Sequence, residues 1–175
     1  EEDTSSLKGI NFSDILANSV HGQIADISFD ADTIHCAVES FSLREKSGFL
    51  LKKFSTKASI SPVLLKLDDL HILTNNSRVV TNLSFKYKTY DDFNHFIENV
   101  KMKSRFTSSN IEMEDIAYFA PELDGLQKRV FLNGEVSGKV GELKGRDIFL
   151  MMGDETSFRG DFDMTGLPDI NQTFM

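Results

Sequence analysis

Three runs of alternating apolar residues lie within residues 129–164, and they constrain the fold more than any other feature of the chain. Side chains of a β-strand point to opposite faces with a period of two, so each run places its apolar groups on one face. Residues 141–147 and 153–156, between the runs, have the composition of turns. The region is therefore predicted to be a meander of antiparallel strands with one apolar and one polar face. The apolar members of the runs are Val130, Leu132 and Val136, then Ile148, Leu150 and Met152, then Phe158, Phe162 and Met164.

The same alternation predicts strands over most of the preceding chain. Leu65 and Leu67 share a parity in one such segment. Leu83, Phe85 and Tyr87 share one in the next. The parity of the apolar residues changes near Glu39 and again at residues 68–69, which predicts a β-bulge at each place. Further strands are expected at residues 22–29, 33–44, 49–60, 63–72, 79–88, 100–106 and 111–115.

Two short segments interrupt the strands with helical spacing. Phe93, Phe96, Ile97 and Val100 recur at helical intervals after a pair of aspartates, and residues 115–123 fit one helical turn that Pro121 ends. Residues 10–20 fit either a short helix or an irregular strand. The fold is therefore expected to be mostly β, with nine or ten strands and one or two short helices. We treat residues 1–175 as a single β-rich unit in which residues 1–20 form a poorly defined lead-in.

Composition excludes several classes of function. The net charge of −8 argues against nonspecific binding to nucleic acid or to anionic surfaces, which requires an excess of lysine and arginine. Cys36 is the sole cysteine, and the four histidines are not at metal-ligand spacing. We find no catalytic constellation, no metal site and no cofactor motif, so no enzyme activity is assigned.

The sequence does not begin with methionine, and it has no signal peptide and no apolar run of about 20 residues that would span a bilayer. We therefore expect it to be an internal segment of a longer protein, with any membrane anchor outside it.

Four stretches carry a resemblance to a known family. They are residues 60–79 (ISPVLLKLDDLHILTNNSRV), 116–123 (IAYFAPEL), 131–162 (FLNGEVSGKVGELKGRDIFLMMGDETSFRGDF) and 166–170 (GLPDI). The chain resembles the repeating middle of AsmA-like proteins over roughly residues 40–170. The likeness is greatest to the TamB (translocation and assembly module) branch of Bacteroidetes-type bacteria.

The resemblance implies an elongated, curved antiparallel β-sheet that forms an open groove, or β-taco, with a hydrophobic interior. It implies a periplasmic segment of an inner-membrane-anchored protein. Such a groove carries phospholipid between the inner and outer membranes and supports outer-membrane biogenesis. The implied partners are phospholipid acyl chains and a BamA-type outer-membrane barrel protein.

In such a groove, acyl chains rather than a second sheet would cover the apolar face, and each buried CH₂ contributes about 0.8 kcal/mol. The sequence does not decide whether the helix at residues 91–100 would plug the groove or pack outside it. The expected lipid-binding residues are Leu65, Leu67, Leu83, Phe85, Tyr87, Val130, Leu132, Val136, Ile148, Leu150, Met152, Phe158, Phe162 and Met164.

Two alternatives stay open at this point. One is a protein-interaction or chaperone module that holds outer-membrane strands by strand pairing. The other is a closed β-sandwich spacer, because a sandwich core would show the same alternation.

Overall fold

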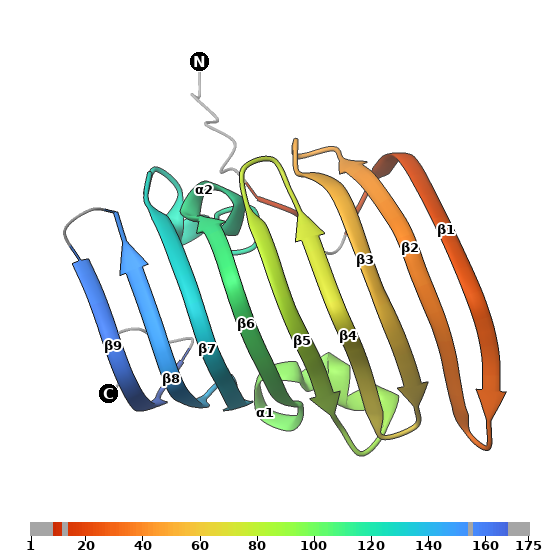
Figure 1. The fold of residues 1–175 in the computed structure, drawn as a ribbon. Helices are drawn as coiled ribbons and strands as arrows, with labels where there is room; N and C mark the ends of the chain where they lie inside the picture. The colour runs from red at the N-terminus through yellow and green to blue at the C-terminus, as the bar shows by residue number, and fades with distance from the viewer. Residues whose placement is uncertain (1–8, 12–13, 154–155, 168–175) are drawn as a thin grey trace.

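The protein is a single nine-stranded sheet in which the strands follow one another in sequence order and every neighbouring pair is antiparallel (Figure 1). The computed structural model describes residues 9–11, 14–153 and 156–167. Within them the fold class is confirmed as mostly β and open. The closed sandwich is wrong for this part of the chain, because its strands form one sheet and not two. The strands are β1 (Ala17–Asp30), β2 (Thr33–Glu45), β3 (Leu50–Ser61), β4 (Leu64–Leu73), β5 (Arg78–Lys86), β6 (Lys101–Glu112), β7 (Arg129–Lys139), β8 (Glu142–Met152) and β9 (Thr156–Thr165).

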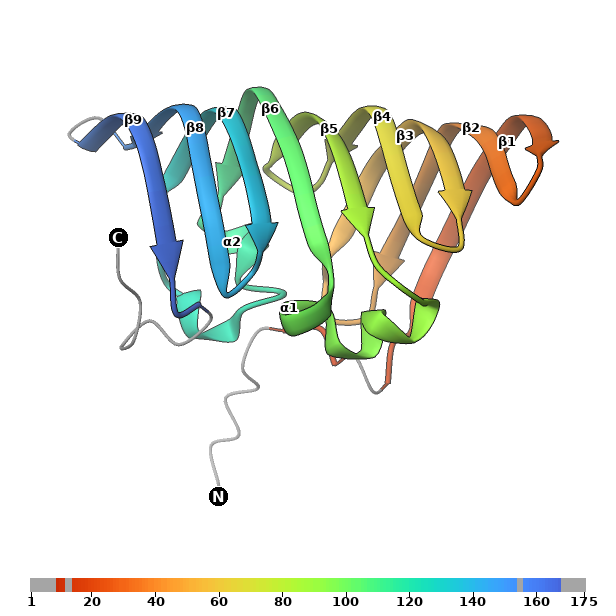
Figure 2. The same cartoon turned by 90° about the horizontal axis from the view of Figure 1, so that it is seen from below.

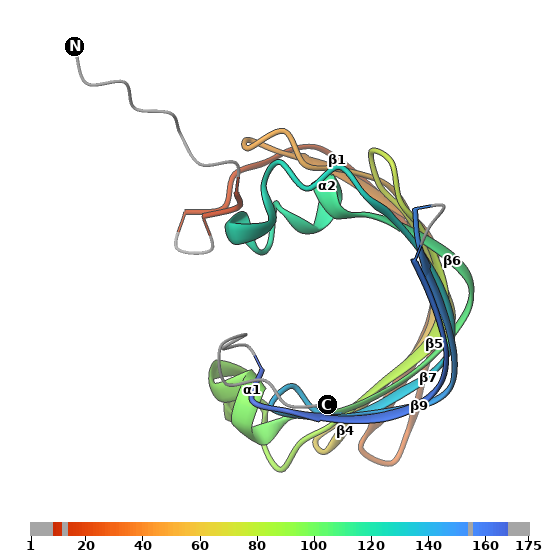
Figure 3. The same ribbon diagram turned by 90° about the vertical axis from the view of Figure 1, so that its left-hand side faces the viewer.

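The strands bend, so that the sheet seen end-on is a C (Figure 3). The pairing register slips within β4 at Asp69, within β6 at Ser108 and within β8 at Asp147. These three residues have φ of +51°, +47° and +52°. An extra residue with positive φ is a β-bulge, which bends its strand and increases the local twist. Bulges in alternate strands therefore give the sheet its common curvature.

Each of these bulges is held by a side chain of the following strand. The backbone N–H of Asp69 donates to Asn82 Oδ1 at 2.9 Å, and that of Ser108 donates to Asn133 Oδ1 at 2.6 Å. The N–H of Asp147 donates to Asp161 Oδ1 at 2.8 Å. A bulge leaves a backbone donor outside the ladder, and a donor without an acceptor is costly. The side-chain acceptors remove that cost.

Two expectations about bends are confirmed, and three strand boundaries are wrong. The strand expected at residues 111–115 ends at Glu112, and residues 113–116 are helical. The register slips between Val38 and Phe41 and between Leu67 and Leu70, where the apolar parity changes. Residues 142–147, expected to be a turn, belong to β8. Residues 107–110, expected to separate two strands, lie inside β6. In both cases the bulge changes the parity within one strand, which imitates a break in the alternation.

Short helical segments lie at both rims of the C, on the side of its mouth (Figures 2 and 3). One rim carries η1 (Tyr90–His95) and α1 (Phe96–Asn99), which replace the single helix expected at residues 91–100. The other carries α2 (Met113–Ile116) and η2 (Pro121–Leu123). The segment 90–99 therefore neither plugs an end of the sheet nor packs on its convex face. Among the described residues, no helix has the length and hydrophobicity required to cross a membrane.

A buried aspartate joins α2 to the turn between β4 and β5. Asp115 Oδ2 accepts hydrogen bonds from the hydroxyls of Thr74 at 2.5 Å and Ser77 at 2.6 Å. It also accepts from the backbone N–H groups of Asn76 at 3.1 Å and Ser77 at 2.8 Å. Burial raises the pKa of Asp115, but the hydrogen bonds from Ser77 and Thr74 outweigh burial and hold that pKa below its ordinary value.

Replacing Asp115 by alanine is expected to lower the free energy of unfolding by about 3 kcal/mol, because buried donors on Thr74 and Ser77 lose their acceptor. Urea unfolding measures this change. Asp124→Ala, at an exposed position of the same rim, is the control and is expected to change stability by less than about 0.5 kcal/mol. Equal effects of the two substitutions would contradict the role given to Asp115.

The lowered pKa also predicts a pH dependence. A carboxyl group whose folded pKa lies below its unfolded value of about 3.9 contributes its full stability above that value. The contribution is lost as the pH falls through the folded pKa. The stability difference between the wild type and Asp115→Asn is therefore expected to be constant from pH 7 to about 5 and to shrink below about pH 4. Urea titrations at these pH values test it, and a difference that does not change with pH would refute it.

Candidate functional site

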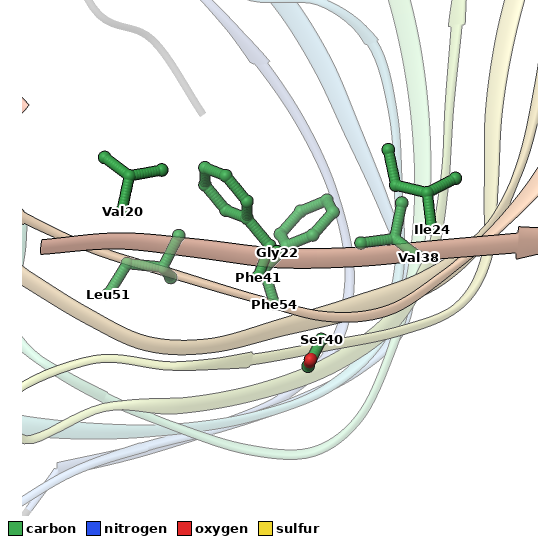
Figure 4. A pocket seen from close by; sticks show the side chains of 8 residues that line it. All are labelled: Val20, Gly22, Ile24, Val38, Ser40, Phe41, Leu51 and Phe54. Atoms are coloured by element: carbon green, nitrogen blue, oxygen red, sulfur yellow. The ribbon is translucent and has the colours of Figure 1, made fainter.

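A hollow of about 530 Å³ lies on the concave face at β1–β3. It is lined almost wholly by aliphatic and aromatic side chains, and Figure 4 shows most of them on one side of the ribbons, with Ser40 on the other. Ile24 lies directly opposite Val38, and Phe41 lies opposite Phe54, because the strand register pairs them. Residues directly opposite on neighbouring strands share a face. The residues around the hollow are Val20, Gly22, Ile24, Val38, Ser40, Phe41, Leu51 and Phe54.

The face of this hollow continues across the whole sheet. In β3, Phe54 and Ala58 share a parity, and β3 itself has no extra residue between them. Ala58 starts a row of directly paired residues that reaches β9. A second row runs beside it from β2 to β9. Neither row contains a charged residue. The first row is Ala58, Leu67, Leu83, Ser104, Val136, Gly145 and Phe162, and the second is Ile34, Ile60, Leu65, Phe85, Met102, Gly138, Leu143 and Met164.

The strand residues expected from the sequence to bind lipid all lie on this concave face. Leu65, Leu67, Leu83, Phe85, Val136, Phe162 and Met164 belong to the two rows themselves. Val130, Leu132, Ile148, Leu150, Met152 and Phe158 share the parity of the rows in β7, β8 and β9 once the bulge at Asp147 is counted. The geometry thus brings together residues from five strands that sequence parity alone could only group strand by strand.

Tyr87 differs from the other expected residues because it follows β5 and is buried. Its hydroxyl donates to the backbone carbonyl of Ser61 at 2.7 Å, and its ring lies 4.8 Å from that of Phe93 in η1. Phe93 and Phe96 also pack edge-on against Phe85, with ring centroids 6.3 and 5.5 Å apart. The segment 90–99 therefore covers one rim of the concave face with the chain's own aromatic rings. Tyr87 lies under this cover and not in the open hollow.

A glycine makes room for one of the aromatic residues of the face. A Cβ atom added to Gly145 would lie 2.3 Å from the ring of Phe162, its direct partner on β9. The ring therefore lies flat against the backbone of β8. Glycine within a strand commonly marks a place where another group approaches the backbone closely.

Solvent exposure varies strongly along the concave face. Ile24 on β1 is 58% exposed and Phe29 on the same strand is 74% exposed. Leu70 and Ile148, which lie beside the bulges of β4 and β8, are each 1% exposed. The bend crowds side chains in the middle of the concave face, whereas β1 has a described neighbour on one side only. The apolar surface open to a ligand is therefore greatest at β1–β3.

The few polar side chains among these residues are already satisfied. The hydroxyls of Thr81 and Ser104 hydrogen-bond to each other at 2.7 Å, and that of Thr56 donates to the carbonyl of Asp68 at 2.8 Å. A satisfied hydroxyl offers little to a polar ligand. The concave face can therefore hold apolar groups by burial. The free thiol of Cys36, opposite Ala58, also lies on this face.

The convex face carries paired charges, and Phe131, Phe149 and Met151 of β7 and β8 also lie on it. Glu135 contacts both Lys103 at 3.0 Å and Arg105 at 2.9 Å, and these contacts lower its pKa, with the hydrogen bond from Lys103 the largest cause. Other pairs join neighbouring strands or residues of the same face: Lys57 with Asp69, Lys66 with Asp68, and Arg146 with Asp163. These ion pairs keep charged side chains on the face opposite the apolar rows.

Sequence reasoning missed the residues of the β1–β3 hollow. Leu51, Phe41 and Val38 lie on the same face only because of slips in β2 and β3. The bulge predicted near Glu39 places Val38 and Phe41 on one face, whereas the slip between Leu51 and Phe54 in β3 was not predicted.

Comparison of this chain with protein-family models, curated proteins and solved structures finds no match.

Two isoleucines of the concave face test the difference in solvent exposure between β1 and β8. Ile24→Asp is expected to cost less than about 1 kcal/mol of stability, since the new carboxylate stays in water. Ile148→Asp is expected to cost about 4 kcal/mol or to prevent folding, because it would bury an unpaired charge. Chemical denaturation followed by circular dichroism measures both. Equal costs would mean that the concave face is covered at β1 as it is at β8.

Proposed function

We propose that this segment holds the acyl chains of phospholipid on its concave face. We further propose that it carries phospholipid between the inner and outer membranes as part of a periplasm-spanning protein similar to the AsmA-like and TamB proteins. The observation that carries the proposal is an apolar concave face that runs across all nine strands and that no second sheet covers in the described part of the chain. An extended apolar surface of this kind, if it would otherwise face water, marks a binding site.

The chemistry of the face suits acyl chains better than a polar substrate. Its side chains are aliphatic or aromatic, and burial of each CH₂ group contributes about 0.8 kcal/mol without any directional contact. A chain can therefore shift along the rows with little change in the free energy of its contacts. This property favours transport along the sheet over tight binding at one place. The resemblance in sequence adds a role in outer-membrane biogenesis and a BamA-type barrel protein as partner.

The two outer strands favour a second function. The described residues leave one edge of β1 and one edge of β9 without a neighbouring strand. Unpaired strand edges bind extended peptides by β-augmentation. A module that holds outer-membrane protein strands at these edges is therefore the alternative, and it depends on backbone hydrogen bonds and not on the concave side chains.

Native mass spectrometry with lipid extraction tests the first function. The purified wild type is expected to carry phospholipid or to take it up. The double variant Ile24→Asp/Phe158→Asp is expected to lose at least about 90% of it, because both charges lie at exposed positions of the concave face, at its two ends on β1 and β9. The control is Met151→Asp, since Met151 is 41% exposed on the convex face and Phe158 is 36% exposed on the concave face.

The control variant should retain its lipid. Lipid bound equally well by the folded double variant, or a wild type that takes up no lipid, would overturn the proposal. Binding of strand peptides that survives in the double variant would then support the alternative.

A further inference from the structure

Three lysines stand side by side at one rim of the sheet. Lys86 ends β5 and lies directly opposite Lys101, which begins β6. Met102 pairs with Gly138 of β7, so Lys139 lies beside Lys101 one position further along the same two strands. Like charges directly opposite on neighbouring strands are destabilising. The sequence separates these lysines by up to 53 positions (139 − 86), and only the strand register brings them together.

The three lysines line a hollow of about 420 Å³ at that rim. Its other lining residues are Tyr87, Lys88, Asp92 and Asn99. The carboxylate of Asp92 is engaged locally, since Oδ2 accepts the backbone N–H of Lys88 at 2.6 Å and that of Thr89 at 3.3 Å, and Oδ1 accepts from Asn99 Nδ2 at 3.1 Å. The hollow therefore contains more cationic groups than acidic ones.

Three lysines elsewhere on the convex face are paired with carboxylates. Lys57, Lys66 and Lys103 each contact a carboxylate within 3.0 Å. Among the ion pairs of the described residues, none includes Lys86, Lys101 or Lys139. Lys139 is paired in register with Glu142, but their charged atoms are not in contact. An acidic protein with a net charge of −8 thus leaves three neighbouring cations without a contacting counter-ion.

We infer that this lysine hollow binds a phosphate group, and that the phosphate is that of a lipid headgroup. Lysine ammonium groups bind phosphate oxygens as compact charges, and charge-assisted hydrogen bonds are about twice as strong as neutral ones. A bound phosphate would relieve the repulsion between Lys86 and Lys101. The net charge of the whole chain opposes broad adsorption to anionic surfaces, but it does not oppose a local site of this size.

The position of the hollow connects it with the concave face. Tyr87 lines the hollow and packs against Phe93, which also packs against Phe85 of the apolar row. A headgroup held by the lysines would therefore lie at the rim that the segment 90–99 covers, next to the apolar row. The assignment of the phosphate to a lipid rests on the proposed function, whereas the binding of phosphate by the lysines does not.

Isothermal titration calorimetry with three probes tests this inference. The probes are dihexanoyl phosphatidic acid below its micelle concentration, glycerol 3-phosphate, which lacks tails, and dihexanoylglycerol, which lacks phosphate. The variant is Lys86→Gln/Lys101→Gln/Lys139→Gln. Its control, Lys53→Gln/Lys128→Gln/Lys144→Gln, removes the same charge from lysines outside the hollow. Thermal melts check that both variants fold.

The lysine variant is expected to bind phosphatidic acid at least about tenfold more weakly than the wild type, and the control less than about twofold. The difference should decrease at high salt. Equal affinities of the wild type and the lysine variant for phosphatidic acid would overturn the inference. Equal affinities of the wild type for glycerol 3-phosphate and phosphatidic acid would overturn its lipid part.

The neutral probe separates this inference from the proposed function. If the concave face holds no acyl chains, dihexanoylglycerol will not bind to the wild type, and the proposed function fails. Glycerol 3-phosphate will still distinguish the lysine variant from the control if the hollow binds phosphate.

Discussion

The β-bulges of alternate strands are the constraint on which the rest of the structure depends. Asp69, Ser108 and Asp147 each add one residue to a strand, and each is held by an acceptor from the next strand. A flat sheet would present its apolar face evenly to water and to other sheets. The bends instead fold that face inward, so that a single layer partly shelters its own apolar side chains.

The curvature also explains how one sheet can be stable without a second layer. Leu70 and Ile148 are buried where the bend crowds their neighbours, and short helical segments add aromatic cover at one rim and a buried aspartate at the other. What stays open is the β1–β3 end of the face and the mouth of the C. An apolar surface enclosed on one side and open along its length suits a flexible apolar ligand, which is the physical basis of the proposed lipid transport.

Much of the sheet was predictable because half-burial leaves a period-two signal. The strands β2, β3 and β4 follow directly from the alternation. The apolar parity within β7 and β9 does so as well. The bulges at residues 108 and 147 were not recognised. Ser108 lies between Phe106 and Ile111, whose change of parity imitates the end of one strand and the start of another. Asp147 closes a segment whose glycines imitate a turn. The segment 90–99 had a helical period, but its docking on Phe85 depends on contacts between distant residues.

The sequence by itself determined that the chain forms strands with one apolar and one polar face, because the side-chain period of a strand is a local property. It also determined which residues share that face between one bulge and the next. Only the tertiary structure decided that all nine strands turn the same face inward, since this depends on register and on bulges that shift parity. The tertiary structure likewise decided that Lys86, Lys101 and Lys139 become neighbours, because strand pairing joins positions that are distant along the chain.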